Sequence, residues 1–374
     1  MSTLARTDNS ILARWWWTVD RWNLAAVAIL AGTGMMMALA ASPPVASRLG
    51  LDTYYFAGRQ AVFLGLGLFI VVATSLLSPK GVRRLAMAVL ALAMALMVAV
   101  LAIGPEIKGA TRWISLGAFS LQPSEFAKPA LAVTAAWFFA QARLQEGYPG
   151  NLVATGLFLM VAALLLMQPD VGMTMVVAAV WGVQFFLAGL PIILVMAIGF
   201  AFLGASVGAY FTFSHVRARV DRFFDPSAGE GYQVMRSLDA FHNGGLTGRG
   251  PGEGRVKEVL PDAHTDFIFA VAGEEFGMFV CVAIVGLFAF VVVRGLTRCY
   301  RDDNLFVLLA SAGLLVQFAV QAMINLASTL HLIPPKGMTL PFVSYGGSST
   351  VAIALGIGMM LALTRSRPGE GGAR

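Results

Sequence analysis

Long apolar stretches recur along most of this 374-residue chain, and they limit its fold more than any single motif does. A helix that crosses the hydrocarbon core of a bilayer needs about 20 predominantly apolar residues. Only 12% of the residues are charged, whereas soluble domains carry about 25%. The sequence therefore predicts an all-α polytopic integral membrane protein with about ten transmembrane helices. The predicted spans are residues 24–42, 60–77, 84–103, 124–141, 152–168, 171–189, 191–213, 267–293, 304–330 and 345–364.

The basic residues predict how these spans are oriented. Half of the 26 lysines and arginines lie in the tails and in the short connections of one side, which the positive-inside rule assigns to the cytoplasm. An even number of spans puts both ends of the chain on that side. We expect cytoplasmic tails at residues 1–21 and 365–374 and a single transmembrane domain at 22–364. A large extracytoplasmic loop, residues 214–266, separates the seventh and eighth spans.

The stretch Leu260–Gly277 runs from a polar loop into an apolar helix and carries acidic groups to the expected membrane surface. A carboxylate in or beside hydrocarbon is costly, and it is therefore a functional candidate by default. Asp266 lies at this boundary and is the candidate catalytic residue, with a helix N-cap as the structural alternative. Glu274 and Glu275 follow roughly 12–13 Å deeper along the helix. We interpret them as packing or hydrogen-bonding groups within the bundle, with a structural role.

Polar residues at the external ends of other spans form a candidate substrate site. Lys128 lies in the first turns of a span, where Glu125 three residues earlier can pair with it; a structural ion pair is the alternative to phosphate binding. Trp113 also fits an interfacial anchor. Asp170 fits either a helix cap or an acid that orients a basic residue or a sugar hydroxyl. The substrate-binding candidates in these clusters are Arg59, Arg112, Trp113, Glu125, Lys128 and Asp170.

The large loop contains two recognisable segments. Tyr232, Met235, Leu238 and Phe241 recur at helical spacing before Gly244-Gly245, which predicts a short interfacial helix. The glycine-rich stretch 248–254 follows and is typical of a mobile loop that folds over substrate. It leads to Lys257, which we add to the substrate-binding candidates.

A second glycine-rich turn precedes the last span. Successive glycines and serines at a helix start can form a backbone nest for an anion, but they also permit close helix approach. The candidates here are Lys336, Ser344, Gly346, Gly347 and Ser348. The four histidines and two cysteines lack metal-ligand spacing, so no metal site is predicted; a divalent cation is the one cofactor left open. No nucleic-acid motif is present.

The ordered motifs resemble one family of bacterial membrane proteins, the SEDS family (shape, elongation, division and sporulation). They are Arg112-Trp113, Gln122-Pro-Ser-Glu-x-x-Lys128, Gln168-Pro-Asp-x-Gly172, Tyr232-Gln233, Leu260-Pro-x-x-His-Thr-Asp-Phe-Ile-Phe269 and Ser344-Tyr-Gly-Gly-Ser-Ser349. The stretch 335–341 and Lys257-Glu258 look more like the division branch than the elongation branch. Pro129 departs from the family, in which leucine is common at this position.

The resemblance implies a peptidoglycan glycosyltransferase that polymerises lipid II with a class B penicillin-binding transpeptidase and other membrane proteins of the division machinery. The family's essential aspartate falls on Asp266, and its cavity residues fall on Arg59, Arg112, Glu125, Lys128 and Asp170. The expected location is the bacterial cytoplasmic membrane at the division septum, in contact with lipid II, lipid-linked glycan and membrane lipids.

These expectations combine into a mechanistic hypothesis. Asp266 would act as general base on the 4-hydroxyl of incoming lipid II in an inverting glycosyl transfer, while basic residues bind the diphosphate. Two alternatives remain open on the sequence: a transporter that flips lipid II, and a non-enzymatic scaffold for a division transpeptidase.

Overall fold

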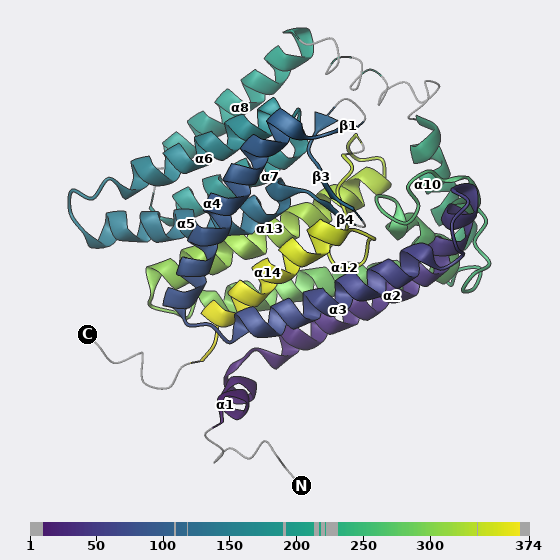
Figure 1. Cartoon of the computed structure of the whole chain (residues 1–374), viewed down its shortest axis with the longest axis horizontal. Helices are drawn as coiled ribbons and strands as arrows, with labels where there is room; N and C mark the ends of the chain where they lie inside the picture. The colour runs from purple at the N-terminus through teal and green to yellow at the C-terminus, as the bar shows by residue number, and fades with distance from the viewer. Residues whose placement is uncertain are drawn as a thin grey trace.

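The computed structural model describes residues 10–107, 110–117, 119–189, 192–212, 217, 221, 231–334 and 336–366. The predicted tail residues 1–9 and 367–374, residue 213 of the seventh predicted span, and residues 214–216, 218–220 and 222–230 of the predicted large loop lie outside the described residues. The described part is a bundle of long helices with small β-hairpins at one end (Figure 1).

Each of the ten predicted spans coincides with one helix, within six residues at either end. These helices are α2 (Arg21–Arg48), α3 (Tyr55–Ser75), α4 (Pro79–Ile103), α5 (Pro123–Leu144), α6 (Gly150–Met167), α7 (Val171–Leu187), α8 (Ile192–Thr212), α12 (Ile268–Cys299), α13 (Leu305–Thr329) and α14 (Gly347–Leu363). Within the described residues, six of them are long and apolar enough to cross a membrane, and α7 and α14 are shorter apolar helices. The chain is thus a multi-pass α-helical membrane protein, as predicted.

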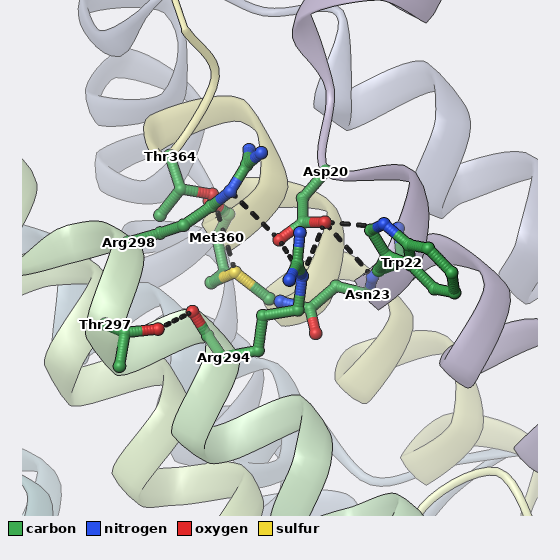
Figure 2. A network of polar contacts seen from close by, with 8 residues as sticks. All are labelled: Asp20, Trp22, Asn23, Arg294, Thr297, Arg298, Met360 and Thr364. Carbon is green, nitrogen blue, oxygen red and sulfur yellow. Dashed lines mark hydrogen bonds and ion pairs between the residues drawn. The ribbon is translucent and has the colours of Figure 1, made fainter.

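Asp20 links α2 to α12 at one end of the bundle (Figure 2). Its carboxylate is 0% exposed and caps α2 by accepting a hydrogen bond from the Trp22 amide at 3.1 Å. Arg294 approaches it at 2.9 Å and Arg298 at 3.1 Å, both from the last turns of α12. Two guanidinium groups compensate a charge that would be costly to bury alone. This is the Asp20 end of the bundle; the opposite end, where α12 begins, is the Asp266 end.

Ordered structure extends into both segments that were predicted as tails. Helix α1 (Ile11–Thr18) precedes α2, and the indole of Trp15 donates a hydrogen bond to the Ser75 hydroxyl at 2.8 Å. Beyond α14, Arg365 Nε donates to the Thr18 hydroxyl at 3.0 Å. The described residues of these segments are therefore packed against the Asp20 end.

The connection between α4 and α5 contains two short antiparallel hairpins that the hydropathy pattern did not predict. Strand β1 (Glu106–Ile107) pairs with β2 (Ala110–Thr111), and β3 (Ile114–Leu116) pairs with β4 (Phe119–Leu121). Arg112 and Trp113 lie between the two hairpins in the sequence, so these strands restrict the backbone of two candidate site residues.

Helix α14 forms the centre of the bundle. All its residues from Ser348 to Leu363 except Val351 are buried, and it packs against α3, α5 and α13. A helix that is apolar and buried on every side contacts protein rather than lipid. The segment before α14 also enters the bundle, since Leu340, Phe342 and Val343 are each 1% exposed.

The short helix predicted within the large loop is present as α10 (Gly231–Gly244), and its position at a membrane interface stays a prediction. Its outer face exposes Tyr232, Met235 and Leu238 by more than 40% each. On its inner face, the buried Ser237 hydroxyl donates to the Thr329 carbonyl oxygen at 2.7 Å. Helix α11 (Val256–Val259) follows and leads towards the start of α12.

A break interrupts α12, which the sequence predicted as one continuous span. Gly277 has φ 76° and ψ −176°, a conformation that residues with a Cβ rarely adopt. Four backbone hydrogen bonds join the loop after α10 to the helix on both sides of the break: Arg249 N–H to Glu274 O (3.0 Å), Gly250 N–H to Glu275 O (3.0 Å), Met278 N–H to Gly245 O (3.0 Å) and Phe279 N–H to Leu246 O (3.3 Å). Hydrocarbon offers no partner to open backbone groups, so the loop replaces the bonds that the helix loses.

The ring of His264 holds the loop before α12 against two other elements. Its centroid lies 4.4 Å from that of Phe56 in α3 and 5.4 Å from that of Tyr345 before α14. Burial lowers the pKa of His264 to about 4; Arg48 also lowers it, and Asp262 opposes the shift. The imidazole is therefore neutral in the folded protein at neutral pH.

Replacement of Gly277 should test the break. Gly277→Ala forces a strained φ and places the new methyl group against the Leu246 carbonyl oxygen at 2.5 Å, so we expect a loss of about 2–4 kcal/mol in folding free energy. Thermal unfolding in detergent would show this as a lower Tm. Gly286→Ala is the matched control on the same helix, because nothing lies within 4 Å of its added Cβ. Equal Tm values for the two variants would contradict the described packing at the break.

The lowered pKa of His264 predicts a loss of stability in acid. The unfolded chain takes up the proton near pH 6.5 and the folded chain only near pH 4, so the stabilisation is complete above pH 6.5 and is lost as the pH falls towards 4. We expect wild type to lose about 2–3 kcal/mol more than His264→Gln between pH 7.5 and 4.5. Tm measured at both pH values would report it. His242→Gln, at an exposed position of α10, should behave as wild type does.

Candidate active site

Asp266 lies in a tight loop whose backbone is fixed from two sides. Its amide donates to the Asp262 carbonyl oxygen at 3.1 Å, and Asp262 has the uncommon φ of 53°. Its own carbonyl oxygen accepts hydrogen bonds from the amide group of Asn325 at 3.0 Å and the hydroxyl of Thr329 at 3.5 Å, both on α13. The N-cap of α12 is Phe267, so Asp266 lies one residue before the cap position. Its side chain is half-buried.

Segment 336–340 brings Lys336 towards the same place. Asp266 Oδ2 lies 3.6 Å from where a Cβ on Gly337 would stand, and Gly337 has φ +61°. Lys336 Cδ lies 3.4 Å from the corresponding position on Gly172, at the start of α7. The half-buried Lys336 therefore lies between the Asp266 loop and the N-terminus of α7.

Arg112 and Asp170 form one unit at the start of α7. Arg112 Nε donates to the Gln168 carbonyl oxygen at 2.9 Å, Nη2 donates to that of Pro169, and Nη1 lies 3.3 Å from Asp170 Oδ2. The other carboxylate oxygen of Asp170 accepts the Met173 amide at 3.1 Å and caps α7. Asp170 thus has both roles that the sequence left open: it caps a helix and orients a basic residue.

Lys128 and Glu125 form the predicted ion pair, with 2.8 Å between Nζ and Oε2. Lys128 Nζ also donates to Gln321 Oε1 at 2.9 Å, and the Gln321 amide group donates to the Thr339 carbonyl oxygen at 3.3 Å. Lys128 is 3% exposed and Glu125 is 7% exposed. The pair is therefore inside the bundle, and Gln321 connects it to the segment that carries Lys336.

Arg59 and Trp113 complete the half-buried groups at this end. Arg59 Nη1 donates to the Tyr55 hydroxyl at 2.6 Å. Its guanidinium group lies over the rings of Tyr55 and Phe119, with centroid distances of 5.3 and 5.5 Å. Such stacking holds the guanidinium group in place at this end of the bundle.

The structure places Lys257 away from this site. Its Nζ lies 2.5 Å from Glu275 Oε1, and the residue is only 6% exposed. Glu275 is roughly 13 Å along the chain of α12 from Asp266. Lys257 is therefore paired with a buried carboxylate that the sequence pattern did not match to it, and a substrate-binding role for it stays a prediction. Glu274 and Glu275 accept hydrogen bonds from the loop, as we predicted for them.

The glycine–serine turn before α14 is tightly packed. Ser344 is 1% exposed; its hydroxyl accepts the Leu340 amide at 2.8 Å, and its carbonyl oxygen accepts Gln60 Nε2 at 3.1 Å. A Cβ on Gly347 would lie 2.7 Å from the Phe63 ring, and one on Gly346 would lie 3.0 Å from Thr339. These contacts favour close approach as the reason for the glycines. Ser348 is buried at the start of α14, and an anion nest here stays a prediction.

The sequence reading missed the amide side chains that hold this site together. Gln321 and Asn325 lie four residues apart on α13, and Gln60 lies on α3; all three bond loop segments near Asp266. The sequence does contain a signal for them, because polar amide side chains inside apolar spans need hydrogen-bond partners. Among the described residues, no three His, Cys, Asp or Glu side chains group closely enough to hold a metal ion.

Known proteins resemble the chain along nearly its whole length. A family model described as "Cell cycle protein", which covers FtsW, RodA and SpoVE, matches residues 21–368. The "Probable peptidoglycan glycosyltransferase FtsW" of Caulobacter vibrioides is 48% identical over 370 residues, which cover 99% of this chain and 95% of the relative. The relative of the same name from Escherichia coli O6:H1 is 34% identical, over 89% of this chain and 82% of its own length.

Two solved structures share the fold. One, described as "Structural coordination of polymerization and crosslinking by a peptidoglycan synthase complex", has a TM-score of 0.76 and 28% identity over 93% of this chain and 98% of that chain. The rod shape determining protein RodA of Thermus thermophilus gives a TM-score of 0.69 with 28% identity over 93% and 97%. The similarity thus extends over sequence and fold alike, and the relatives carry the name of the division branch. The chain belongs to the FtsW/RodA/SpoVE family, the SEDS family that its ordered motifs predicted.

Proposed function

We propose that the protein is a peptidoglycan glycosyltransferase that polymerises lipid II, with Asp266 as the general base. The observation that carries this proposal is a half-buried carboxylate, fixed through its backbone by α13, beside a segment that carries a half-buried lysine. The names of the relatives support the same activity. A base on rigid support next to cations is what glycosyl transfer from a diphosphate requires.

The reaction proposed is a single inverting displacement. The Asp266 carboxylate takes the proton of the 4-hydroxyl on one lipid-linked sugar as that oxygen attacks the anomeric carbon of another. A new glycosidic bond forms, and the bond from the anomeric carbon to the diphosphate oxygen breaks. The lipid diphosphate leaves with the electron pair, and fixed cations stabilise the growing charge.

Exposure separates the basic residues into two groups. Arg59, Arg112 and Lys336 are half-buried, so we assign the diphosphate to them. Lys128 is inside the bundle with Glu125 as its partner, and we assign it a supporting role. Through Gln321 it stabilises the backbone at Thr339, close to Lys336.

The membrane orientation and the partners belong to the same proposal. We propose that the Asp266 end faces outwards, that the Asp20 end and both tails (1–21 and 365–374) are cytoplasmic, and that residues 22–364 form one domain. We further propose that the protein works at the septum with a class B penicillin-binding transpeptidase and other division proteins. The likeness to a chain from a complex that couples polymerisation to crosslinking supports such a partner.

The first test is Asp266→Asn, which is nearly isosteric but a poor base. Polymerisation of labelled lipid II by the purified protein, with and without the cognate transpeptidase, should fall by about 10²–10⁴-fold while Tm stays unchanged. Normal polymer yield from this variant would sink the assignment. Wild-type protein that moves lipid II between leaflets but makes no polymer would favour a transporter, and protein that does neither would favour a scaffold.

The second test is Lys336→Gln. If Lys336 stabilises the leaving diphosphate, kcat should fall by about 10²–10³-fold, since that charge develops only in the transition state. Lys80→Gln, at an exposed lysine in the first turn of α4, is the control and should leave kcat unchanged. A rise in KM for lipid II with unchanged kcat would instead assign Lys336 to ground-state binding.

A further inference from the structure

We infer that Glu274, Glu275 and Lys257 are positioning residues that hold the Asp266 loop in place by anchoring segment 245–257 to the break in α12. The inference rests on the proposed function, because it concerns how the proposed base is placed. The carboxylates begin eight residues beyond Asp266, or about 12 Å along a helix, too far to share its proton. They act on the backbone that leads to it.

Both carboxylates are buried and bind backbone amides of the segment. Glu274, which is 0% exposed, accepts the Arg255 amide at 3.1 Å and the Val256 amide at 2.9 Å. Glu275, which is 1% exposed, accepts the Gly252 amide at 3.0 Å. A buried carboxylate needs several donors to offset its lost hydration, and here the loop backbone provides them.

Lys257 adds an ion pair to these contacts between segment 245–257 and α12. Its Nζ lies 2.5 Å from Glu275 Oε1 and donates to the Gly252 carbonyl oxygen at 3.0 Å. Residues 252 and 257 are thereby tied to one carboxylate. The segment has no room to shift towards the helix, since a Cβ on Gly254 would stand 2.9 Å from Glu274 Oε2. Gly248 is tighter still, because an added Cβ would overlap the Glu275 carbonyl group.

The chain from Lys257 to Asp266 is short and fixed along its length. Leu260 is 0% exposed, and its carbonyl oxygen accepts Arg48 Nη2 at 3.1 Å. Ala263 is 0% exposed, in the same apolar cluster as Val45 and Phe56. A shift at Lys257 would therefore be transmitted to Asp266 rather than absorbed by a slack loop. A misplacement of about 1 Å at a reacting group can cost 10²-fold in rate.

The contacts of segment 248–254 favour a different role from the one its sequence predicts. Its glycines are typical of a mobile loop that folds over substrate. In the structure three of its amides are bonded to α12, those of Arg249 and Gly250 to backbone carbonyl oxygens and that of Gly252 to the buried Glu275 carboxylate. The glycines allow the two backbones to touch, which is a packing role rather than a gating role.

The test uses Glu274→Gln and Glu275→Gln in the full-length protein, assayed with labelled lipid II and the transpeptidase. A positioning role predicts that kcat falls by at least about tenfold while KM for lipid II stays within about twofold. Asp20→Asn is the matched control. It also removes the charge of a buried carboxylate, and the basic partners of that carboxylate, Arg294 and Arg298, lie at the opposite end of α12. It should change Tm without changing kcat.

Hydrogen exchange supplies a second readout that does not depend on turnover. Amides of residues 249–256 should exchange at least about tenfold faster in both glutamate variants than in wild type. In Asp20→Asn their exchange rates should equal those of wild type. Unchanged kcat in both variants, or a kcat loss in Asp20→Asn equal to theirs, would overturn the inference. Protection of residues 249–256 that survives both substitutions would overturn it as well. Wild-type protein without polymerase activity would count against the proposed function alone, because exchange still reports on the anchoring.

Discussion

Open backbone groups find no partner in hydrocarbon, and this constraint explains the most unusual part of the fold. Helix α12 is broken at Gly277, and the break persists because residues 245–250 supply the missing donors and acceptors. Residues 245–250 are therefore a structural part of the helix bundle. The same contact fixes the positions of α11 and of the start of α12. The need to pair backbone groups at the break therefore also determines the path of the chain that leads to Asp266.

Neutral amides, rather than charges, join most of the candidate site. Gln60, Gln321 and Asn325 each extend from a helix to a carbonyl oxygen of a loop, at Ser344, Thr339 and Met338 respectively. Burying an amide with its bonds made costs far less than burying an ion, so these residues can lie deep in the bundle. The basic residues to which we assign the substrate diphosphate are half-buried. The ion pair of Lys128 with Glu125 is instead buried inside the bundle.

The sequence predicted the helices well because hydropathy reports burial in lipid directly. It also predicted α10, the pair of Lys128 with Glu125, and the bonding role of Glu274 and Glu275. It missed the break, since a single glycine in an apolar run does not change a hydropathy average. It did not predict the pairing of Lys257 with Glu275, because the two residues lie 18 positions apart and meet only after the loop has docked. The hairpins at Arg112 were too short to leave a periodic pattern.

The burial of α14 has a consequence for how the protein is made. Ribosomes deliver helices in order, and α14 comes after all the other described helices, yet it occupies the centre against α3, α5 and α13. The earlier helices must therefore surround an unfilled interior until α14 has been made. A nascent chain that stops before α14 would expose packing surfaces to lipid and to protein quality control.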